Sequence, residues 1–250
     1  MRVLTQSVRL ARVLLGGRVS CHTLVQQSLK GKSGLEIGGP SRVFQKWYQP
    51  MPIYSVVGSL DNCVYSDSTV WASHPHNYVF HSRKKPGKTI LCEGSDLASI
   101  PDGSYDFVLS SHNLEHFANP IKALKEWERV VRPDGYLVLV LPFYAKTFDH
   151  RRRPTEVNHL FEDLERNTQE DDLTHLPEIL QLHDLNMDPL AGSFEQFRER
   201  SLKNIDNRCL HHHVFDERNS CELLQRLGMD VIAVEIALPI HIFLFAHYRK

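Results

Sequence analysis

The stretch 102–142 constrains the fold of this chain more than any other part of it. An apolar segment, Tyr105 to Leu109, leads into the polar run Ser110-Ser111-His112-Asn113, and a second apolar segment spans Tyr136 to Leu141. Between them, apolar residues recur on one face of a helical pattern. The order predicts a buried strand, an amphipathic helix and another buried strand, which is the repeating unit of a parallel sheet.

The predicted helix has clear start and stop signals. Asn119 is suited to cap its first turn, and Pro120 suits the first helical position. Pro133-Asp134-Gly135 predicts a tight turn before the second strand. The apolar face consists of Ile121, Leu124, Trp127, Val130 and Val131. Because ligands of open α/β sheets bind just beyond the carboxyl ends of strands, residues 110–113 are the first candidates for a site.

Similar patterns elsewhere predict the rest of the sheet. Strands are expected at Leu35 to Ile37, Ile53 to Val57, Thr89 to Cys92, Val231 to Glu235 and Ile240 to Tyr248, and a helix at Asp216 to Leu227. The last two strands are too close in sequence for a crossover helix, so they should form an antiparallel hairpin at the edge. The predicted fold is α/β, with a doubly wound, mostly parallel, seven-stranded sheet.

Residues 143–215 interrupt this alternation between the fifth strand and the next helix. A segment this long requires helices of its own in a compact domain. Leu160 to Glu165 and Leu176 to His183 have helical patterns. Since the insertion follows the carboxyl end of a strand, we expect it to form a lid over the site. The chain is thus divided into a basic N-terminal segment, 1–26, and one domain, 27–250, with a lid at about 143–215.

Composition excludes several classes of partner. The formal net charge of −1 gives no sign of a nucleic-acid-binding surface. No segment approaches the roughly 18 consecutive apolar residues that a membrane-spanning helix needs. The sequence says nothing about the oligomeric state. Five widely spaced cysteines, without a Cys-x-x-Cys motif, suggest free thiols in a reducing compartment.

The N-terminus has a charge pattern of its own. Residues 1–35 contain six basic side chains and no acidic one: Arg2, Arg9, Arg12, Arg18, Lys30 and Lys32. Arginines alternating with Val and Leu predict a basic amphipathic helix, a composition typical of a mitochondrial transit peptide. A surface helix before the first strand explains the pattern equally well, so mitochondrial and cytoplasmic locations both remain open.

The segments DGSYDFVLSSHNLEH and ERVVRPDGYLVLVLP resemble the core of class I S-adenosylmethionine (SAM) dependent methyltransferases. They are most similar to the small-molecule subgroup that includes the ubiquinone and menaquinone C-methyltransferases. The resemblance covers roughly residues 34–141 and resumes weakly over 214–248. It implies a Rossmann-like fold, SAM as the cofactor and a small molecule as the methyl acceptor.

The resemblance also implies cofactor-binding residues. Glu36, Gly38 and Gly39 occupy the place of the glycine-rich motif that holds the amino acid end of SAM, although Pro40-Ser41 stands where further glycine is common. Glycines there let the backbone approach a ligand closely. Asp61 is the candidate for the ribose hydroxyls, with a plain surface aspartate as the alternative.

Two further segments would complete the cofactor site. Asp96 matches the residue that accepts from the adenine amino group, with the backbone N–H of Leu97 on the ring. Ser111 lies near the expected position of the transferable methyl group. His112 could act as a general base toward a hydroxyl acceptor, or merely hydrogen-bond the cofactor or backbone. Glu115 and His116 recur in the family mainly as residues that organise the turn.

The insertion offers polar side chains to an acceptor. His150, Arg151 and Arg152 follow the fifth strand, where arginines could clamp an anionic substrate or simply belong to a charged loop. The insertion also holds seven histidines, at 150, 159, 175, 183 and 211–213.

Imidazoles are common zinc and iron ligands. The histidines of the insertion include no His-x-x-x-His pair, so no metal-binding residue is assigned. Two alternatives to a methyltransferase remain: a non-catalytic scaffold with the same fold, and a metal-dependent enzyme that uses these histidines.

Overall fold

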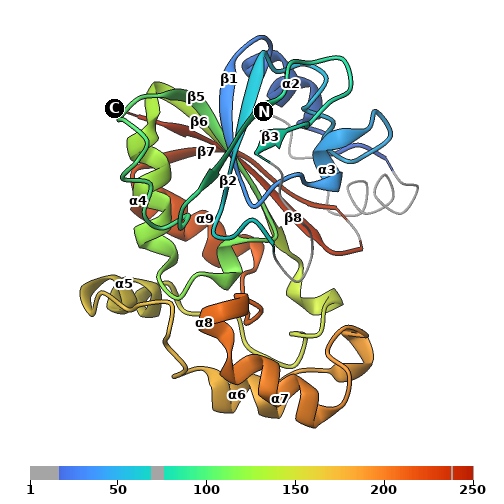
Figure 1. Ribbon diagram of the computed structural model, residues 1–250, viewed down its shortest axis with the longest axis vertical. Helices are drawn as coiled ribbons and strands as arrows, with labels where there is room; N and C mark the ends of the chain where they lie inside the picture. The colour runs from blue at the N-terminus through green and yellow to red at the C-terminus, as the bar shows by residue number, and fades with distance from the viewer. Residues whose placement is uncertain (1–16, 69–75, 238, 250) are drawn as a thin grey trace.

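The computed structural model describes residues 17–68, 76–237 and 239–249. They form an eight-stranded sheet with helices on both faces and a helical layer below it (Figure 1). The strands are β1 Ser33–Ile37, β2 Ser59–Val64, β3 Asn77–Tyr78, β4 Gly87–Leu91, β5 Tyr105–Ser111, β6 Val131–Pro142, β7 Met229–Ala237 and β8 His241–Tyr248. The helices are α2 His22–Leu29, α3 Arg42–Gln45, α4 Pro120–Val130, α5 Val157–Glu165, α6 Leu176–Leu182, α7 Phe194–Leu202, α8 Asn204–Asn207 and α9 Glu217–Arg226.

The strand order is β3-β4-β2-β1-β5-β6-β8-β7. From β4 to β6 all neighbours are parallel, and β8 runs antiparallel to β6 and β7. The mostly parallel sheet with antiparallel C-terminal strands is therefore confirmed. The strand count is eight and not seven, because the two-residue strand β3 pairs antiparallel with the edge strand β4. From β1 the chain continues to β2 on one side of β1, and it later enters β5 on the other side of β1. This reversal creates a topological switch point between β1 and β5.

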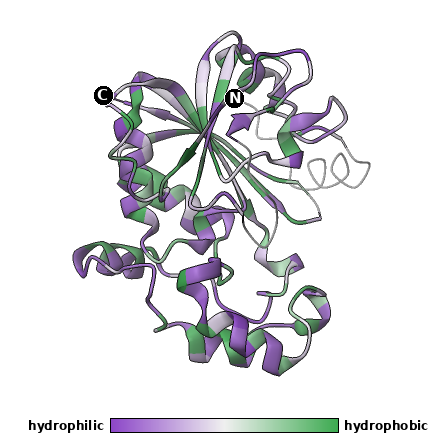
Figure 2. Cartoon of the chain, in the orientation of Figure 1, coloured by the Kyte–Doolittle hydropathy of each residue, from purple (hydrophilic) through white to green (hydrophobic). Residues whose placement is uncertain are grey.

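The two faces of the sheet bury separate cores. Leu124, Trp127 and Val130 of α4 pack on one face together with α9, and Val25 and Leu29 of α2 pack on the other. Figure 2 shows hydrophobic residues concentrated along the strands. The start of α4 matches the sequence prediction, because the side chain of Asn119 accepts a hydrogen bond from the backbone N–H of Lys122 at 3.0 Å.

The prediction of a strand at Ile53 to Val57 was wrong. Ile53, Tyr54 and Val57 are buried, but they lie in the irregular segment between α3 and β2, and the second strand is Ser59–Val64. A run of apolar residues indicates that a segment is buried, but it does not show that the segment is extended. The actual strand begins with a polar residue, so the apolar pattern does not identify its start.

The insertion lies beyond the carboxyl ends of the parallel strands (Figure 1). Its two predicted helices correspond to α5 and α6, while α7 and α8 were not foreseen. A small core of its own holds α6 and α7 together: Leu176, Ile179, Ala191, Phe197 and Leu210. No helix in the described ranges is long and apolar enough to cross a membrane.

The described part of the N-terminal segment belongs to the domain. Val19, Val25 and Leu29 are buried in the second core. The carboxylate of Glu235 in β7 accepts hydrogen bonds from the backbone N–H groups of Ser20 and Cys21 at 2.7 and 2.8 Å. The boundary predicted between residues 26 and 27 therefore falls inside a packed helix. The predicted basic helix within residues 1–16 lies outside the described residues.

Candidate functional site

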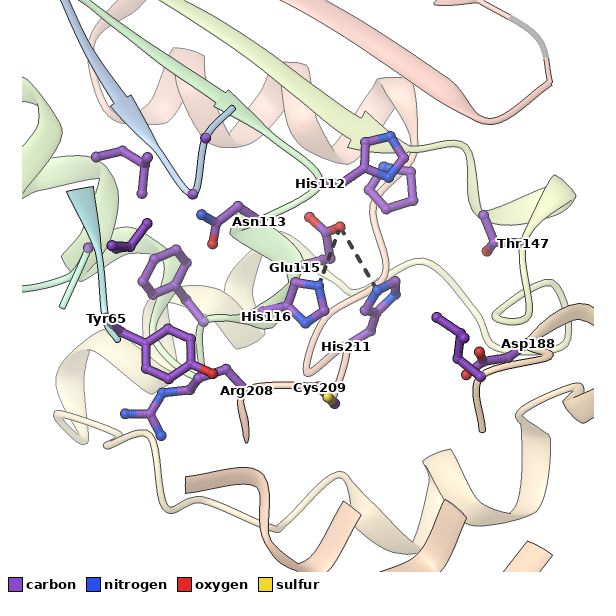
Figure 3. A pocket seen from close by; sticks show the side chains of 18 of the residues that line it. Tyr65, His112, Asn113, Glu115, His116, Thr147, Asp188, Arg208, Cys209 and His211 are labelled. Carbon is purple, nitrogen blue, oxygen red and sulfur yellow. Dashed lines mark ion pairs between the residues drawn. The ribbon is translucent and has the colours of Figure 1, made fainter. Parts of the chain in front are cut away.

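A cavity of about 760 Å³ lies at the carboxyl ends of β1, β2, β4, β5 and β6 (Figure 3). The turns that follow these strands form its upper wall: residues 37–40, 63–65, 93–94, 112–117 and 142–148. The insertion closes the opposite side with Met187, Leu190, Arg200, Arg208 and His211, among others. A cavity of this size at a topological switch point is the usual place for a ligand in such a fold.

The turn after β1 requires glycine at two positions. Gly38 has a φ of +77°, and a Cβ there would lie 2.3 Å from Nδ2 of Asn113. The side chain of Asn62 holds Gly39 by accepting from its N–H at 2.9 Å and donating to its carbonyl oxygen at 3.0 Å. The backbone is therefore fixed and bare where it borders the cavity, as close approach of a ligand requires.

Glu36 supports this turn from behind and does not line the cavity. It is fully buried, and its carboxylate accepts hydrogen bonds from the hydroxyls of Ser41 at 2.6 Å, Tyr54 at 2.6 Å and Tyr78 at 2.5 Å. Burial raises the pKa of Glu36, while these hydrogen bonds oppose the rise. The structure thus gives Glu36 a positioning role in place of the expected direct contact with the cofactor.

The expectation for Asp61 fails because the second strand lies later in the chain than predicted. Asp61 is inside β2, where its carboxylate accepts from the N–H of Lys88 at 2.8 Å and from the hydroxyl of Tyr105 at 2.9 Å. The carboxyl end of β2 is followed by Tyr65, which lines the cavity, and two residues later by Asp67, which is exposed and lies just outside the lining. Asp67 is therefore the carboxylate that follows the second strand.

Asp96 and Leu97 also lie outside the cavity lining. The N–H of Leu97 donates to the carboxylate of Glu126 in α4 at 2.9 Å, and Asp96 is exposed beside the same helix. The residues of this segment that line the cavity are Glu93 and Gly94. A Cβ at Gly94 would lie 2.7 Å from Cζ of Phe117, so the bare backbone makes close contact with that ring.

At the end of β5, His112 lines the cavity and Ser111 does not. Nε2 of His112 lies 2.8 Å from Nδ1 of His241, so the two rings share a hydrogen bond. Burial, and then the neighbouring His241, lower the pKa of His112 to about 3. His112 is consequently a neutral and weak base at neutral pH.

A stronger arrangement of titratable groups lies beside it (Figure 3). Nδ1 of His211 lies 2.6 Å from a carboxylate oxygen of Asp149, and its Nε2 lies 3.9 Å from Glu115. Burial disfavours the charged form of His211, but Asp149 and Glu115 outweigh it and raise the pKa of His211. Burial also raises the pKa of Glu115 to about 7. Neither carboxylate oxygen of Glu115 has a well-formed hydrogen bond to a described residue.

The three residues assigned to substrate binding do not line the cavity. Arg152 is buried and donates to the carboxylate of Asp149 at 3.0 Å and to the carbonyl oxygen of His211 at 2.8 Å. Arg151 pairs with Asp184 at 2.9 Å, and His150 lies 3.7 Å from the same carboxylate. These three side chains pair with carboxylates of the insertion itself, and they therefore do not face the cavity.

Comparison with known proteins agrees with this geometry. A sequence model described as a methyltransferase domain matches residues 61–139. No curated protein matches the chain.

Among solved structures, a SAM-dependent methyltransferase from Methanosarcina mazei has a TM-score of 0.50 at 14% identity, covering 90% of this chain and 97% of that one. A protein from Pyrococcus horikoshii has a TM-score of 0.50 at 14% identity, covering 98% and 92%. At this identity the likeness shows the fold. Together with the domain match, it supports SAM as the cofactor.

Proposed function

We propose that this protein is a SAM-dependent methyltransferase that acts on a small-molecule acceptor. The observation that carries the proposal is the cavity, because five strand ends surround it and fixed glycine turns border it. The cofactor supplies an activated methyl group, so the protein's task is to orient an acceptor and exclude water. The turns at Gly38-Gly39 and Glu93-Gly94 would hold the cofactor, and the insertion would bury the acceptor.

We assign Asp67 to the ribose in place of Asp61. A carboxylate after the second strand suits two neighbouring hydroxyl donors, and Asp67 is the carboxylate in that position. An anionic group on the acceptor would meet Lys146, which lines the cavity, since Arg151 and Arg152 are engaged elsewhere. For the class of acceptor, our proposal rests only on the sequence resemblance to the quinone methyltransferases.

His211 is the residue best placed to accept a proton from the acceptor. Asp149 takes the Nδ1 side of its ring, which leaves the lone pair on Nε2 directed toward Glu115 and the cavity. This pairing holds one tautomer and makes the imidazole a stronger base than an isolated one. His112 lacks such a partner and is better suited to shaping the turn after β5.

Calorimetry with S-adenosylhomocysteine tests the cofactor assignment. We expect wild-type protein to bind it, and Asp67→Asn to weaken binding by roughly 10- to 100-fold, because charge-assisted hydrogen bonds contribute about 1.5–3 kcal/mol. Asp61→Asn is the matched control, which should leave the affinity unchanged because Asp61 lies within β2.

Two outcomes would count against the assignment in different ways. If wild-type protein binds neither the product nor SAM, the proposed function is wrong. If Asp67→Asn binds as tightly as wild type, only the ribose assignment fails. The acceptor itself can be sought by comparing metabolites of cells with and without the gene for a mass difference of one methyl group.

A further inference from the structure

Four side chains of the insertion converge at a second place, outside the cavity lining. His159 and Asp163 lie one turn apart on α5, His175 directly precedes α6, and His213 lies in the segment before α9. One nitrogen or oxygen atom from each lies within 4.8 Å of those of the other three. Segments more than fifty residues apart in sequence thus bring their ligating atoms together.

The distances match those of a closed metal site. Nε2 of His159 lies 3.1 Å from Nε2 of His175 and 3.4 Å from Oδ2 of Asp163, which in turn lies 3.7 Å from Nε2 of His213. Ligand bonds of about 2.0–2.1 Å in a tetrahedron place the ligand atoms roughly 3.3–3.4 Å apart. Small movements of side chains would therefore complete the geometry.

The cluster contains one buried carboxylate oxygen that has no hydrogen bond to a described residue. Oδ2 of Asp163 is buried and has no hydrogen-bond partner among the described residues, while Oδ1 accepts from the hydroxyl of Thr168 at 3.2 Å. His213 is 1% exposed, and its Nε2, the atom nearest Asp163, lies 3.3 Å from the carbonyl oxygen of Ala118, a hydrogen bond that metal binding would replace. Because burying an unpaired carboxylate oxygen is costly, a ligand is expected at this point.

The chemistry of the cluster suits a cation. Imidazole nitrogens and a carboxylate oxygen are ligand types that Zn²⁺ binds in proteins. Glu162 adds a further carboxylate, 3.8 Å from Nδ1 of His159. The backbone carbonyl of Asp163 is held by the side chain of Asn119 at 3.0 Å, which anchors the ligand helix α5 to α4.

We propose that His159, Asp163, His175 and His213 bind one divalent transition-metal ion, with Zn²⁺ as the best fit, and that this ion has a structural role. Three imidazoles and one carboxylate form a typical zinc ligand set, and four protein ligands leave no open position for chemistry. The ion would join α5, the start of α6 and the segment before α9. It would therefore fix the insertion beneath the sheet.

Metal analysis of full-length protein, purified without a polyhistidine tag from zinc-supplemented cells, tests the proposal. We expect about one equivalent of zinc in the wild type and a small fraction of that in His175→Ala and Asp163→Asn. His150→Ala removes an exposed histidine of the same insertion that is not in the cluster, and it should keep the full equivalent.

A second measurement covers variants that fail to fold. Wild-type protein stripped with a chelator should melt roughly 5–10 °C lower than the zinc-loaded form and recover when ZnCl₂ is added. Cobalt should give the visible absorption of a tetrahedral site, and this absorption should be lost in His175→Ala. The proposal would be overturned if the wild-type protein held no stoichiometric metal and its melting temperature did not change when zinc was added. Neither measurement depends on methyl transfer.

Discussion

His211, His212 and His213 are consecutive in sequence but have three different environments. His211 pairs with Asp149 at the cavity. Nε2 of His212 lies 3.0 Å from the side-chain amide of Asn204, and burial lowers the pKa of His212 to about 4. His213 belongs to the proposed metal cluster. The sequence showed only a polar run, because the partners that distinguish the three rings lie elsewhere in the chain.

The role of His211 predicts a loss of activity with a specific pH signature. With a hydroxyl or amine acceptor, His211→Gln should lower kcat by about 10²- to 10⁴-fold, whereas His112→Gln should have a much smaller effect. Activity of the wild type should rise with pH through the raised pKa of His211, because only the neutral ring accepts a proton. Asp149→Asn removes the carboxylate and should move this rise to lower pH. A profile unchanged in Asp149→Asn would contradict the assignment.

Glu115 should make the protein less stable as the pH rises. Burial raises its pKa in the folded state to about 7 from an ordinary value of 4.5. The folded state therefore favours the protonated form, so stability is fully present below pH 4.5 and is lost between there and about pH 7. This difference corresponds to roughly 3 kcal/mol.

Glu115→Gln removes that penalty. Its free energy of unfolding in urea should exceed that of the wild type at pH 8 and approach it near pH 4.5. An equal difference between the two proteins at both pH values would show that ionisation of Glu115 is not the cause.

At the scale of elements, Arg152 connects the start of the insertion to its end. Its guanidinium is buried with Asp149 and donates to the backbone carbonyls of His211 and His212. Arg152→Leu should destabilise the protein by about 3–5 kcal/mol, because it leaves the buried Asp149 with His211 alone and removes the donors to the carbonyl oxygens of His211 and His212. Arg151→Ala is the control, since its half-exposed pair with Asp184 contributes about 0–1 kcal/mol. Similar urea midpoints for the two variants would refute this role.

The elements that local patterns predicted well are those with clear periodicity and end signals. The helix over Pro120–Val130 and the apolar parts of the strands around it are examples, since capping and apolar spacing are both local, although β6 already begins at Val131 and includes the turn expected at Pro133-Asp134-Gly135. The second strand was misplaced because Ile53 and Tyr54 are as apolar as strand residues while packing in turns. Because of that error, Asp61 was expected to follow the end of a strand, whereas it lies within β2.

For the whole molecule, the location of the site could be predicted and most of its side chains could not. The carboxyl ends of parallel strands meet at one edge whatever their residues, so topology placed the cavity, Gly38, Gly39 and His112. Which charged group faces the cavity depends on contacts between distant segments. For this reason Arg152, expected to bind the substrate, is buried within the insertion, whereas His211, to which no role was assigned, lines the cavity.

The burial of the histidine run has a practical meaning for chromatography. Immobilised nickel captures proteins through accessible imidazoles, and three in a row resemble half of a common affinity handle. In the native fold His212 and His213 are each 1% exposed, and His211 is held by Asp149. Any retention that depends on this run therefore requires the segment to unfold, and native protein could bind only through exposed histidines elsewhere, such as His76 and His150.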